Sequence, residues 1–355
     1  MNARHEPRGG SKGACLGLIL LASAMLTTAA RAQVPSDEMF DPSQMREVRV
    51  TMAADEWLDI VRNPDPDESG DTRVYRCAFS WNGESLANVG IRAKGQASRE
   101  PESPKPGVRF LFNRYEGEEL EGGDRRAEQA FRGLKKLDAN SLRGDPSMMR
   151  DRLIENAAAR FHLVCPRTMH VRFYVNDAYV GLYLIVDNYD QAAVLRRLFR
   201  DRNGNLYKYT WTRDRGADDA TRWRGDDPET YVQSPPVFHV LIWDLDNSMV
   251  DFLPAELWIP RDIMRGFELH VLSRRVMNVP AWREAYFARV RALIDGAFAP
   301  SSVQAEIDSI REQILGAAQE DRNKPYTDAE FEANIALLRR DVPLRVENVR
   351  QQLAR

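Results

Sequence analysis

Cysteine and long apolar runs are both scarce in this chain. It has three cysteines in 355 residues, and beyond residue 32 no stretch approaches the roughly 18 uninterrupted apolar residues that a membrane helix needs. This shortage argues against a membrane anchor in that part of the chain. Cys15 lies within the apolar N-terminal stretch, which leaves Cys77 and Cys165 as the pair that a disulfide would join. The alternative is that Cys77 is a buried free thiol, because it alternates with aromatic residues along one strand face.

The sequence also lacks the motifs of several enzyme classes. No G-x-S-x-G elbow is present, which argues against a serine hydrolase. The glycines at 90–98 match neither G-x-G-x-x-G nor the P-loop, and His162, Cys165 and His170 fit no closed zinc pattern. A net charge of −3, with basic residues scattered throughout, argues against general nucleic-acid binding.

The first residues have the pattern of a secretory signal peptide. Arg4, Arg8 and Lys12 form a basic end, and the apolar stretch that follows is too short to span a bilayer. Ala30-Arg31-Ala32 is an A-x-A cleavage site. We therefore expect residues 1–32 to be removed, residues 33–45 to form a linker, and the product to be secreted or periplasmic.

Strand patterns dominate the first part of the chain and helical patterns the last. Residues 46–210 are rich in β signals, and Asn82-Gly83 between two apolar runs is a strong hairpin signal. Pro146 suits the first position of a helix. Residues 255–355 predict about four helices separated by prolines, at about 257–276, 280–297, 301–319 and 327–354. The sequence therefore predicts an α+β protein with a β-rich N-terminal part and a helical C-terminal part.

Two aspartates end an almost wholly apolar run. Residues 237–243 are apolar or aromatic apart from one histidine, and Asp244-Leu245-Asp246 follows them. Such a run predicts a buried strand that delivers two carboxylates to its open end. Alternation places Asp244 and Asp246 on one side, close enough to share a divalent cation. The alternative is that the pair caps the next segment or forms salt bridges.

Cations follow the first hairpin. Arg92 and Lys94 share one strand face, and cations beside free backbone N–H groups are able to hold phosphate oxygens. Lys105 opens the next strand, where a lysine reaches an ATP phosphate as in protein kinases. Asp187 ends a later strand, where its carboxylate would pair with such a lysine. A solvated strand face is the alternative for each of these residues, and a simple surface charge is the alternative for Arg150.

Taken in chain order, these pieces resemble the spore-coat protein H (CotH) kinase family over about 46–300. The ordered set is far more specific than any one of its members. The resembling stretches are Asn88-Val89-Gly90-Ile91-Arg92-Ala93-Lys94-Gly95 with Ser98, residues 105–112, Phe131-Arg132-Gly133-Leu134-Lys135, Asp145-Pro146-Ser147-Met148-Met149-Arg150-Asp151, Tyr174-Val175-Asn176, Tyr179-Val180-Gly181-Leu182-Tyr183, Asp187, Leu206-Tyr207-Lys208 and Trp243-Asp244-Leu245-Asp246.

The resemblance implies a two-lobed, protein-kinase-like fold for residues 46–355, with an N-lobe at about 46–210 and a C-lobe at about 211–355. It also implies transfer of phosphate from ATP, with Mg²⁺, to serine or threonine of a protein acceptor. The residues that it carries over are Arg92, Lys94 and Lys105 near the nucleotide phosphates, Asp187 where the family usually has a longer glutamate, and Asp244 and Asp246 as the metal-binding pair.

The central segment departs from the family pattern. Family members usually carry a long helical segment there, with an Asn-Tyr-Asp-type loop and a following His-Asn. Only 34 residues separate Lys208 from Trp243, and neither motif occurs in them. The residue that would orient the acceptor hydroxyl therefore has no counterpart, nor does the second metal ligand. One alternative is a catalytically degenerate secreted module that keeps the scaffold. Another is a glycosyltransferase that uses a nucleotide sugar, against which the missing βαβ pattern argues.

Overall fold

The structure is a computed structural model of the whole chain, within which Val34–Arg355 forms one compact unit. It describes residues 35–62, 73–95, 103–115, 129–199, 205–207, 230–232, 238–242, 249, 255–268 and 271–355. The expected signal peptide at 1–32 lies outside these ranges. Within them, no helix combines the length and the apolar character needed to cross a bilayer.

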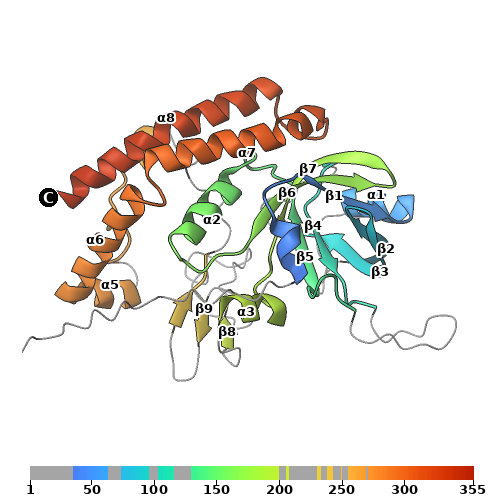
Figure 1. Cartoon of the computed structure of the whole chain (residues 1–355), viewed down its shortest axis with the longest axis horizontal. Coiled ribbons are helices and arrows are strands. Elements are labelled where there is room, and N and C mark those ends of the chain that lie inside the picture. The colour runs from blue at the N-terminus through green and yellow to red at the C-terminus, as the bar shows by residue number, and fades with distance from the viewer. Residues whose placement is uncertain are drawn as a thin grey trace, which may run out of the picture. The chain divides into compact units, whose positions relative to one another are not determined.

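A closed β-barrel forms the first part of the described chain (Figure 1). The strands follow the order β1-β2-β3-β4-β5-β7-β6, and the barrel closes where β1 runs parallel to β6, while the other neighbouring strands are antiparallel. The strands are β1 (Arg46–Thr51), β2 (Tyr75–Trp81), β3 (Glu84–Ala93), β4 (Val108–Leu111), β5 (Lys136–Asn140), β6 (Thr168–Val175) and β7 (Ala178–Val186). The sequence predicted most of these strands but not their closure into a barrel.

Two tight turns set the register of the barrel hairpins. Asn82 and Gly83 join β2 to β3, and both have positive φ. Asn176 and Asp177 join β6 to β7 in the same way. Two central residues with positive φ match the right-handed twist of the flanking strands, which is why asparagine, aspartate and glycine occur there. The predicted hairpin at Asn82-Gly83 is confirmed.

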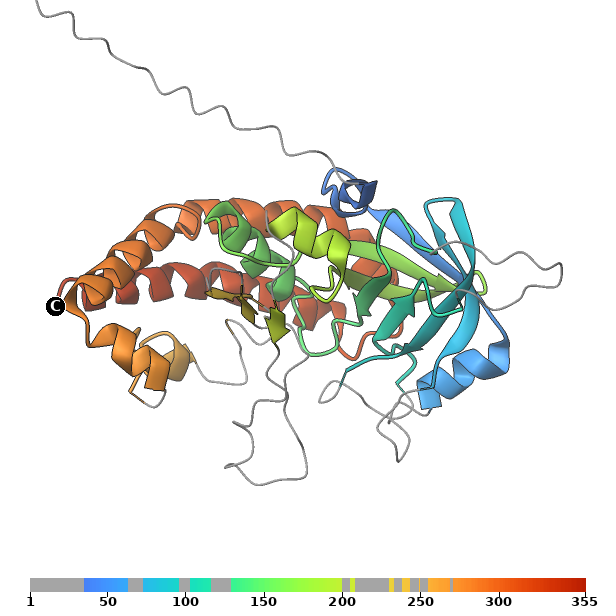
Figure 2. The ribbon, with the colours of Figure 1, turned by 90° about the horizontal axis from the view of Figure 1, so that it is seen from below.

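Helices make up most of the C-terminal part, as predicted. They are α4 (Ala255–Trp258), α5 (Val271–Met277), α6 (Pro280–Asp295), α7 (Pro300–Glu320) and α8 (Asp328–Leu353). The helices that come earlier in the chain are the 3-10 helix η1 (Pro35–Phe40), α1 (Ala54–Arg62), α2 (Arg150–Arg160) and α3 (Ala192–Leu198). α6 and α7 begin with proline at the first turn, where a missing N–H removes no helical hydrogen bond. Figure 2 shows α7 and α8, in orange and red, side by side and extending away from the barrel.

Several predicted boundaries were wrong. The helix expected at 257–276 is two short helices, α4 and α5. α2 begins at Arg150 rather than at Pro146, because Asp145 holds the preceding residues in a turn through its bond to the Ser147 N–H. The strand expected before Asp244 is short: β10 (Phe238–Val240) pairs with β9 (Thr230–Val232), which pairs with β8 (Asn205–Tyr207).

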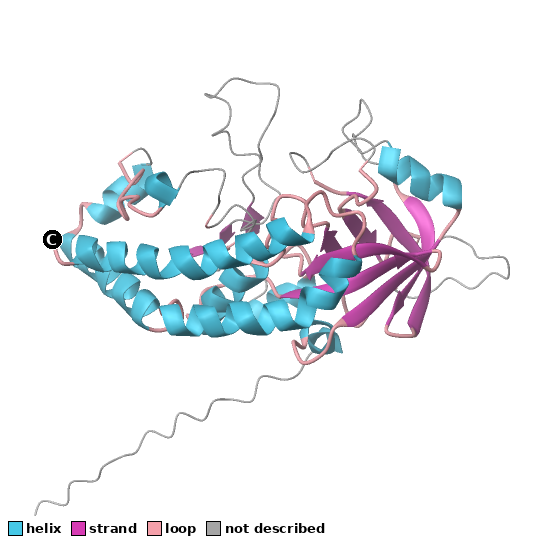
Figure 3. Cartoon of the chain, turned by 90° about the horizontal axis from the view of Figure 1, so that it is seen from above, coloured by secondary structure: helices cyan, strands magenta, loops and turns pink. Residues whose placement is uncertain are grey.

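Two apolar cores lie on opposite faces of the barrel wall. β7 is buried along almost its whole length, because its side chains alternate between the two cores. Tyr183 and Ile185 point into the barrel, where they join the phenylalanine-rich first core. Leu182, Leu184 and Val186 face outward and pack with α2, α7 and α8. Figure 3 shows the strands gathered on one side and the long helices α7 and α8, which we call the helical layer, on the other. The predicted α+β class, with a β-rich N-terminal part and a helical C-terminal part, is confirmed.

Candidate functional site

A charged cluster lies on the outer face of the barrel wall, across β3, β4 and β5. The register places Arg92 beside Arg109, and Arg109 beside Asp138. Arg109 binds Asp138 through two contacts, of 2.6 Å from Nε and 2.9 Å from Nη2. Lys94 Nζ lies 3.4 Å from the same carboxylate and also donates to Asn140 Oδ1. We call Arg92, Lys94, Arg109 and Asp138 the wall cluster.

The Asp138 carboxylate is the fixed negative charge of the wall cluster. Its side chain is fully buried, and burial by itself raises the pKa of a carboxyl group. The charges and hydrogen bonds of Lys94 and Arg109 outweigh burial and hold the pKa of Asp138 well below its usual range. Asp138 therefore stays ionised at neutral pH and fixes the two cations. Arg92 lies beside Arg109 in the register, and its Nη1 donates to the Ala93 carbonyl at 3.1 Å.

Asp187, at the end of β7, is held by two arginines. Arg167 contacts both carboxylate oxygens, at 2.6 and 3.0 Å, and Arg197 of α3 donates at 3.1 Å. Arg167 also reaches the N-terminal helix η1, where it binds Ser36 Oγ at 2.9 Å and pairs with Asp37. Asp187 is fully buried, so this two-arginine clamp supplies the counter-charge that a buried carboxylate requires.

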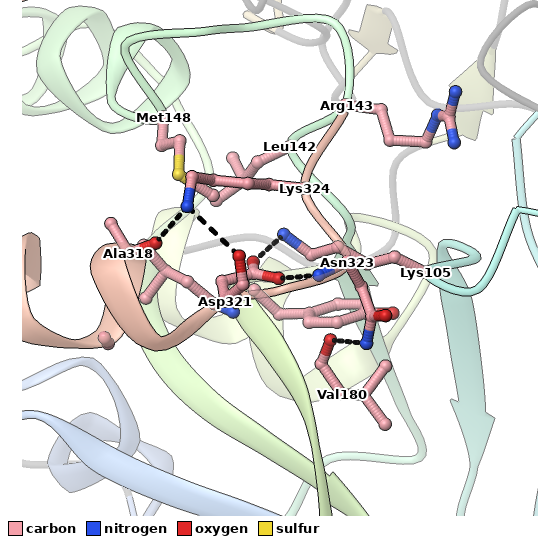
Figure 4. A network of polar contacts seen from close by, with 12 residues as sticks. Lys105, Leu142, Arg143, Met148, Val180, Ala318, Asp321, Asn323 and Lys324 are labelled. Atoms are coloured by element: carbon pink, nitrogen blue, oxygen red, sulfur yellow. Dashed lines mark hydrogen bonds and ion pairs between the residues drawn. The ribbon is translucent and has the colours of Figure 1, made fainter. Parts of the chain in front are cut away.

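Lys105 has a different partner from the expected Asp187. Its ammonium lies 2.6 Å from Asp321 Oδ2, just beyond the end of α7, and both side chains are fully buried (Figure 4). Burial lowers the pKa of Lys105 to about 8, although Asp321 opposes that change. The predicted pairing of Lys105 with Asp187 was therefore wrong, because the lysine turns toward the helical layer. In this structure Lys105 does not join the wall cluster.

The predicted metal pair, Asp244 and Asp246, lies outside the described residues, as do the other residues from 243 to 248; Ile242 and Met249 are the nearest residues that the structure describes. Leu241 is buried in the first core. Ile242 donates its N–H to the Val164 carbonyl at 3.1 Å and accepts from the Tyr189 hydroxyl at 2.7 Å. On the other side, the carbonyl of Met249 accepts from Arg150 Nε at 3.1 Å. Tertiary contacts thus hold Leu241, Ile242 and Met249 in place.

Arg150 is a buried structural residue rather than a surface charge. Its guanidinium is 2 % exposed and pairs with Asp145. Asp145 Oδ2 also accepts the N–H groups of Met149 and Arg150 at 2.8 Å each, so it neutralises the N-terminal end of α2. Arg150 Nη2 lies 3.3 Å from Asn334 of α8. The family-like stretch around Asp145 therefore joins α2 to the helical layer.

Glu155 is a second buried carboxyl on α2. Its Oε2 atom, like the Thr168 hydroxyl, is buried without a hydrogen-bond partner among the residues that the structure describes. Burial raises the pKa of Glu155 well above its usual range, and the charges of Asp151 and Asp187 act in the same direction. Burial and these charges thus favour the neutral form of Glu155, close to the carboxylate that the arginine clamp holds.

The cysteines and histidines of the described chain form no metal site. Cys77 and Cys165 are both free and buried, so the free-thiol alternative is the one observed. His170 is fully buried between Arg152 and the Met148 carbonyl, and burial lowers its pKa to about 3. No group of three or more His, Cys, Asp or Glu side chains that would hold a metal occurs within the described ranges.

Sequence reasoning missed Asp138, Arg167 and Asp321, among other residues of these networks. Asp138 had a usable signal, because a carboxylate inside a buried strand requires a cationic partner. Arg167 and Asp321 had none, since each acts through contacts with residues far away in the chain. Lys105 and Asp321 are 216 positions apart.

Comparison with curated proteins finds no match for this chain. A family model described as CotH kinase protein matches residues 91–237 and 233–347, which together make up most of the chain. The two matched segments overlap at residues 233–237. The chain therefore belongs to the CotH kinase family.

Proposed function

We propose that this protein is an exported kinase that transfers the γ-phosphoryl group of ATP, with Mg²⁺, to serine or threonine of a protein acceptor. The observation that carries the proposal is the wall cluster, which lies inside the region matched by the family model. Phosphoryl transfer depends mostly on positioning and charge neutralisation. Lys94 and Arg109, fixed by one buried carboxylate, with Arg92 beside them, suit a role in holding phosphate oxygens.

The metal role is assigned to Asp244 and Asp246. Paired carboxylates are the ligands that Mg²⁺ prefers in nucleotide sites, where it also takes phosphate oxygens. Both residues lie outside the described part of the chain, so the assignment rests on the apolar run that precedes them and on the family match, which covers them.

We further propose that the barrel is the first lobe of a kinase-like protein and the helical layer its second. The wall cluster belongs to the barrel, whereas Asp321 and Asn334 belong to the helical part. Lys105, in the loop before β4, and Arg150, on α2, each reach the helical part through buried contacts. Such contacts would hold a nucleotide site that needs residues from both lobes.

Nucleotide binding is the first test of this proposal. Titration calorimetry with MgATP should show binding to the wild type and at least about tenfold weaker binding to Lys94→Met, because a charge-assisted hydrogen bond contributes about 1.5–3 kcal/mol. Arg339→Met is the matched control, since Arg339 lies in an exposed ion pair with Asp308 between α8 and α7. A wild type that binds no MgATP at all would refute the proposal.

Phosphoryl transfer is tested separately. Incubation with radiolabelled ATP and a mixture of exported proteins should label serine or threonine, and Asp246→Ala should abolish the labelling. Labelling that survives in Asp246→Ala would remove the metal role from that residue.

A non-catalytic binding module is the second candidate function. It is favoured by the short central segment, in which the Asn-Tyr-Asp and His-Asn motifs of the family are missing. Binding of MgATP without turnover or acceptor labelling would identify the protein as such a module.

A further inference from the structure

The carboxylate of Asp321 joins three parts of the chain. It accepts the Lys105 ammonium at 2.6 Å, the Leu182 N–H at 3.0 Å and the Asn323 N–H at 3.0 Å. Asn323 in turn donates to the Val180 carbonyl at 2.7 Å (Figure 4). The end of α7 is thereby tied to the backbone of β7 on one side and to the loop that precedes β4 on the other.

β7 leaves room for this carboxylate at Gly181. An added Cβ at that position would lie 2.5 Å from Asp321 Oδ2 and 2.7 Å from Cγ, and the residue has φ +149°. A side chain at Gly181 would therefore displace Asp321 from its hydrogen bonds. The glycine of the family-like stretch at 179–183 is explained by the carboxylate that packs against it.

The loop held by Asp321 also holds the backbone of Lys94. Residues 103, 105 and 106 are buried, and the Tyr183 hydroxyl donates to the Pro106 carbonyl at 2.8 Å. The next residue, Gly107, accepts the Lys94 N–H at 2.8 Å. An added Cβ at Gly107 would lie 3.3 Å from the Lys94 carbonyl, so the two backbones pack closely. The ion pair is thus two residues away from the contact that fixes Lys94.

We propose that Lys105 is a positioning residue, which acts through Asp321 to hold Lys94 and the start of β4 in place for the nucleotide phosphates. The inference rests on the proposed function for its nucleotide part, and it assigns Lys105 a role other than direct phosphate contact. The buried ion pair couples the helical layer to the wall cluster. Removing one member of such a pair leaves an uncompensated buried charge, whereas replacing both members is often tolerated.

The test compares Lys105→Met, the double variant Lys105→Met/Asp321→Asn, and Lys94→Met as the reference for direct contact. Methionine keeps the length of the lysine side chain without its charge. Asparagine keeps an oxygen acceptor for the Leu182 N–H, while the Asn323 N–H, which binds the other carboxylate oxygen of Asp321, loses its acceptor. Two quantities are measured for each variant: the dissociation constant of MgATP, and the hydrogen-exchange rate of the Lys94 amide. The exchange rate reports on the backbone and does not need a bound nucleotide.

In Lys105→Met we expect the Lys94 amide to exchange at least about tenfold faster, because Asp321 is left unpaired. The affinity for MgATP should fall by about tenfold in parallel. The double variant should restore slow exchange and bring the affinity to within roughly threefold of the wild type. Lys94→Met should lose affinity while its own amide stays protected.

Two outcomes would overturn the inference. One is an unchanged Lys94 amide in Lys105→Met. The other is a double variant that binds MgATP as weakly as Lys94→Met, which would mean that Lys105 contacts the phosphates itself. If Lys105→Met does not fold, the double variant alone decides between these results. A wild type that binds no MgATP would refute the proposed function, whereas the exchange rates would still test the positioning role.

Discussion

Replacing Gly181 with alanine would place a methyl group against the buried carboxylate of Asp321. The new Cβ would lie 2.5 Å from Oδ2 and 2.7 Å from both Oδ1 and Cγ. The carboxylate would have to retreat by about 1 Å to reach ordinary van der Waals distance. That movement would lengthen its contacts with Lys105 (2.6 Å) and with the Leu182 N–H (3.0 Å) beyond hydrogen-bond range.

Two costs add up in this variant. Holding a non-glycine residue at the φ of +149° seen for Gly181 costs about 1–3 kcal/mol. Disrupting a buried ion pair costs about 3–5 kcal/mol. We therefore expect Gly181→Ala to lower the free energy of unfolding by about 5 kcal/mol, which approaches the whole stability of many domains.

Urea denaturation followed by circular dichroism measures this change, and Gly133→Ala is the matched control. Gly133 also has a positive φ, of +82°, but an added Cβ there meets nothing within 4 Å. Gly133→Ala should therefore show the backbone cost alone, at about 1–2 kcal/mol. If Gly181→Ala destabilises the protein no more than Gly133→Ala does, the close packing of Asp321 against β7 is not important to stability, and the reasoning fails.

Three further predictions concern buried polar groups. Because the pKa of Glu155 is raised, its contribution to stability is fully present below its unfolded-state pKa, about 4.3, and is lost as pH rises through the folded-state value. The unfolding free energy of the wild type, measured between pH 4 and 8, should therefore fall relative to that of Glu155→Gln. Parallel profiles for the two proteins would contradict a buried neutral acid. Burial raises the pKa of Cys77 to about 12 and that of Cys165 to about 11. Ellman's reagent should therefore label neither thiol in the folded protein and both thiols after denaturation in 6 M guanidinium. Rapid labelling without denaturant would show that the thiols are accessible. Arg167→Met leaves Arg197 as the remaining arginine of the clamp around buried Asp187. We therefore expect the free energy of unfolding in urea to fall by about 2–3 kcal/mol and residues 35–40 to be cleaved faster by proteases. Unchanged cleavage there would contradict a role for Arg167 in holding η1.

Local sequence patterns determined most of the secondary structure. Asn82-Gly83 defined a hairpin because few other residues tolerate two consecutive positive φ values, and Pro280 and Pro300 marked helix starts because they need no N–H partner. The ordered family motifs in turn identified Lys94 as a candidate phosphate ligand. The turns and helix starts depend on neighbours within a few residues, and the family motifs depend on their order along the chain, so both can be read from the sequence alone.

The tertiary structure alone decided which charges meet. The sequence predicted that Lys105 and Asp187, which both lie near strand ends, form an ion pair. In the fold, Lys105 pairs with Asp321 instead. Asp187 pairs with Arg167 and Arg197. Closure of the barrel was equally hidden, because it depends on β1 finding β6 across most of the β-rich part. An ion pair between residues 216 positions apart leaves no periodic trace in the sequence, since nothing but the packing of α7 against β7 brings them together.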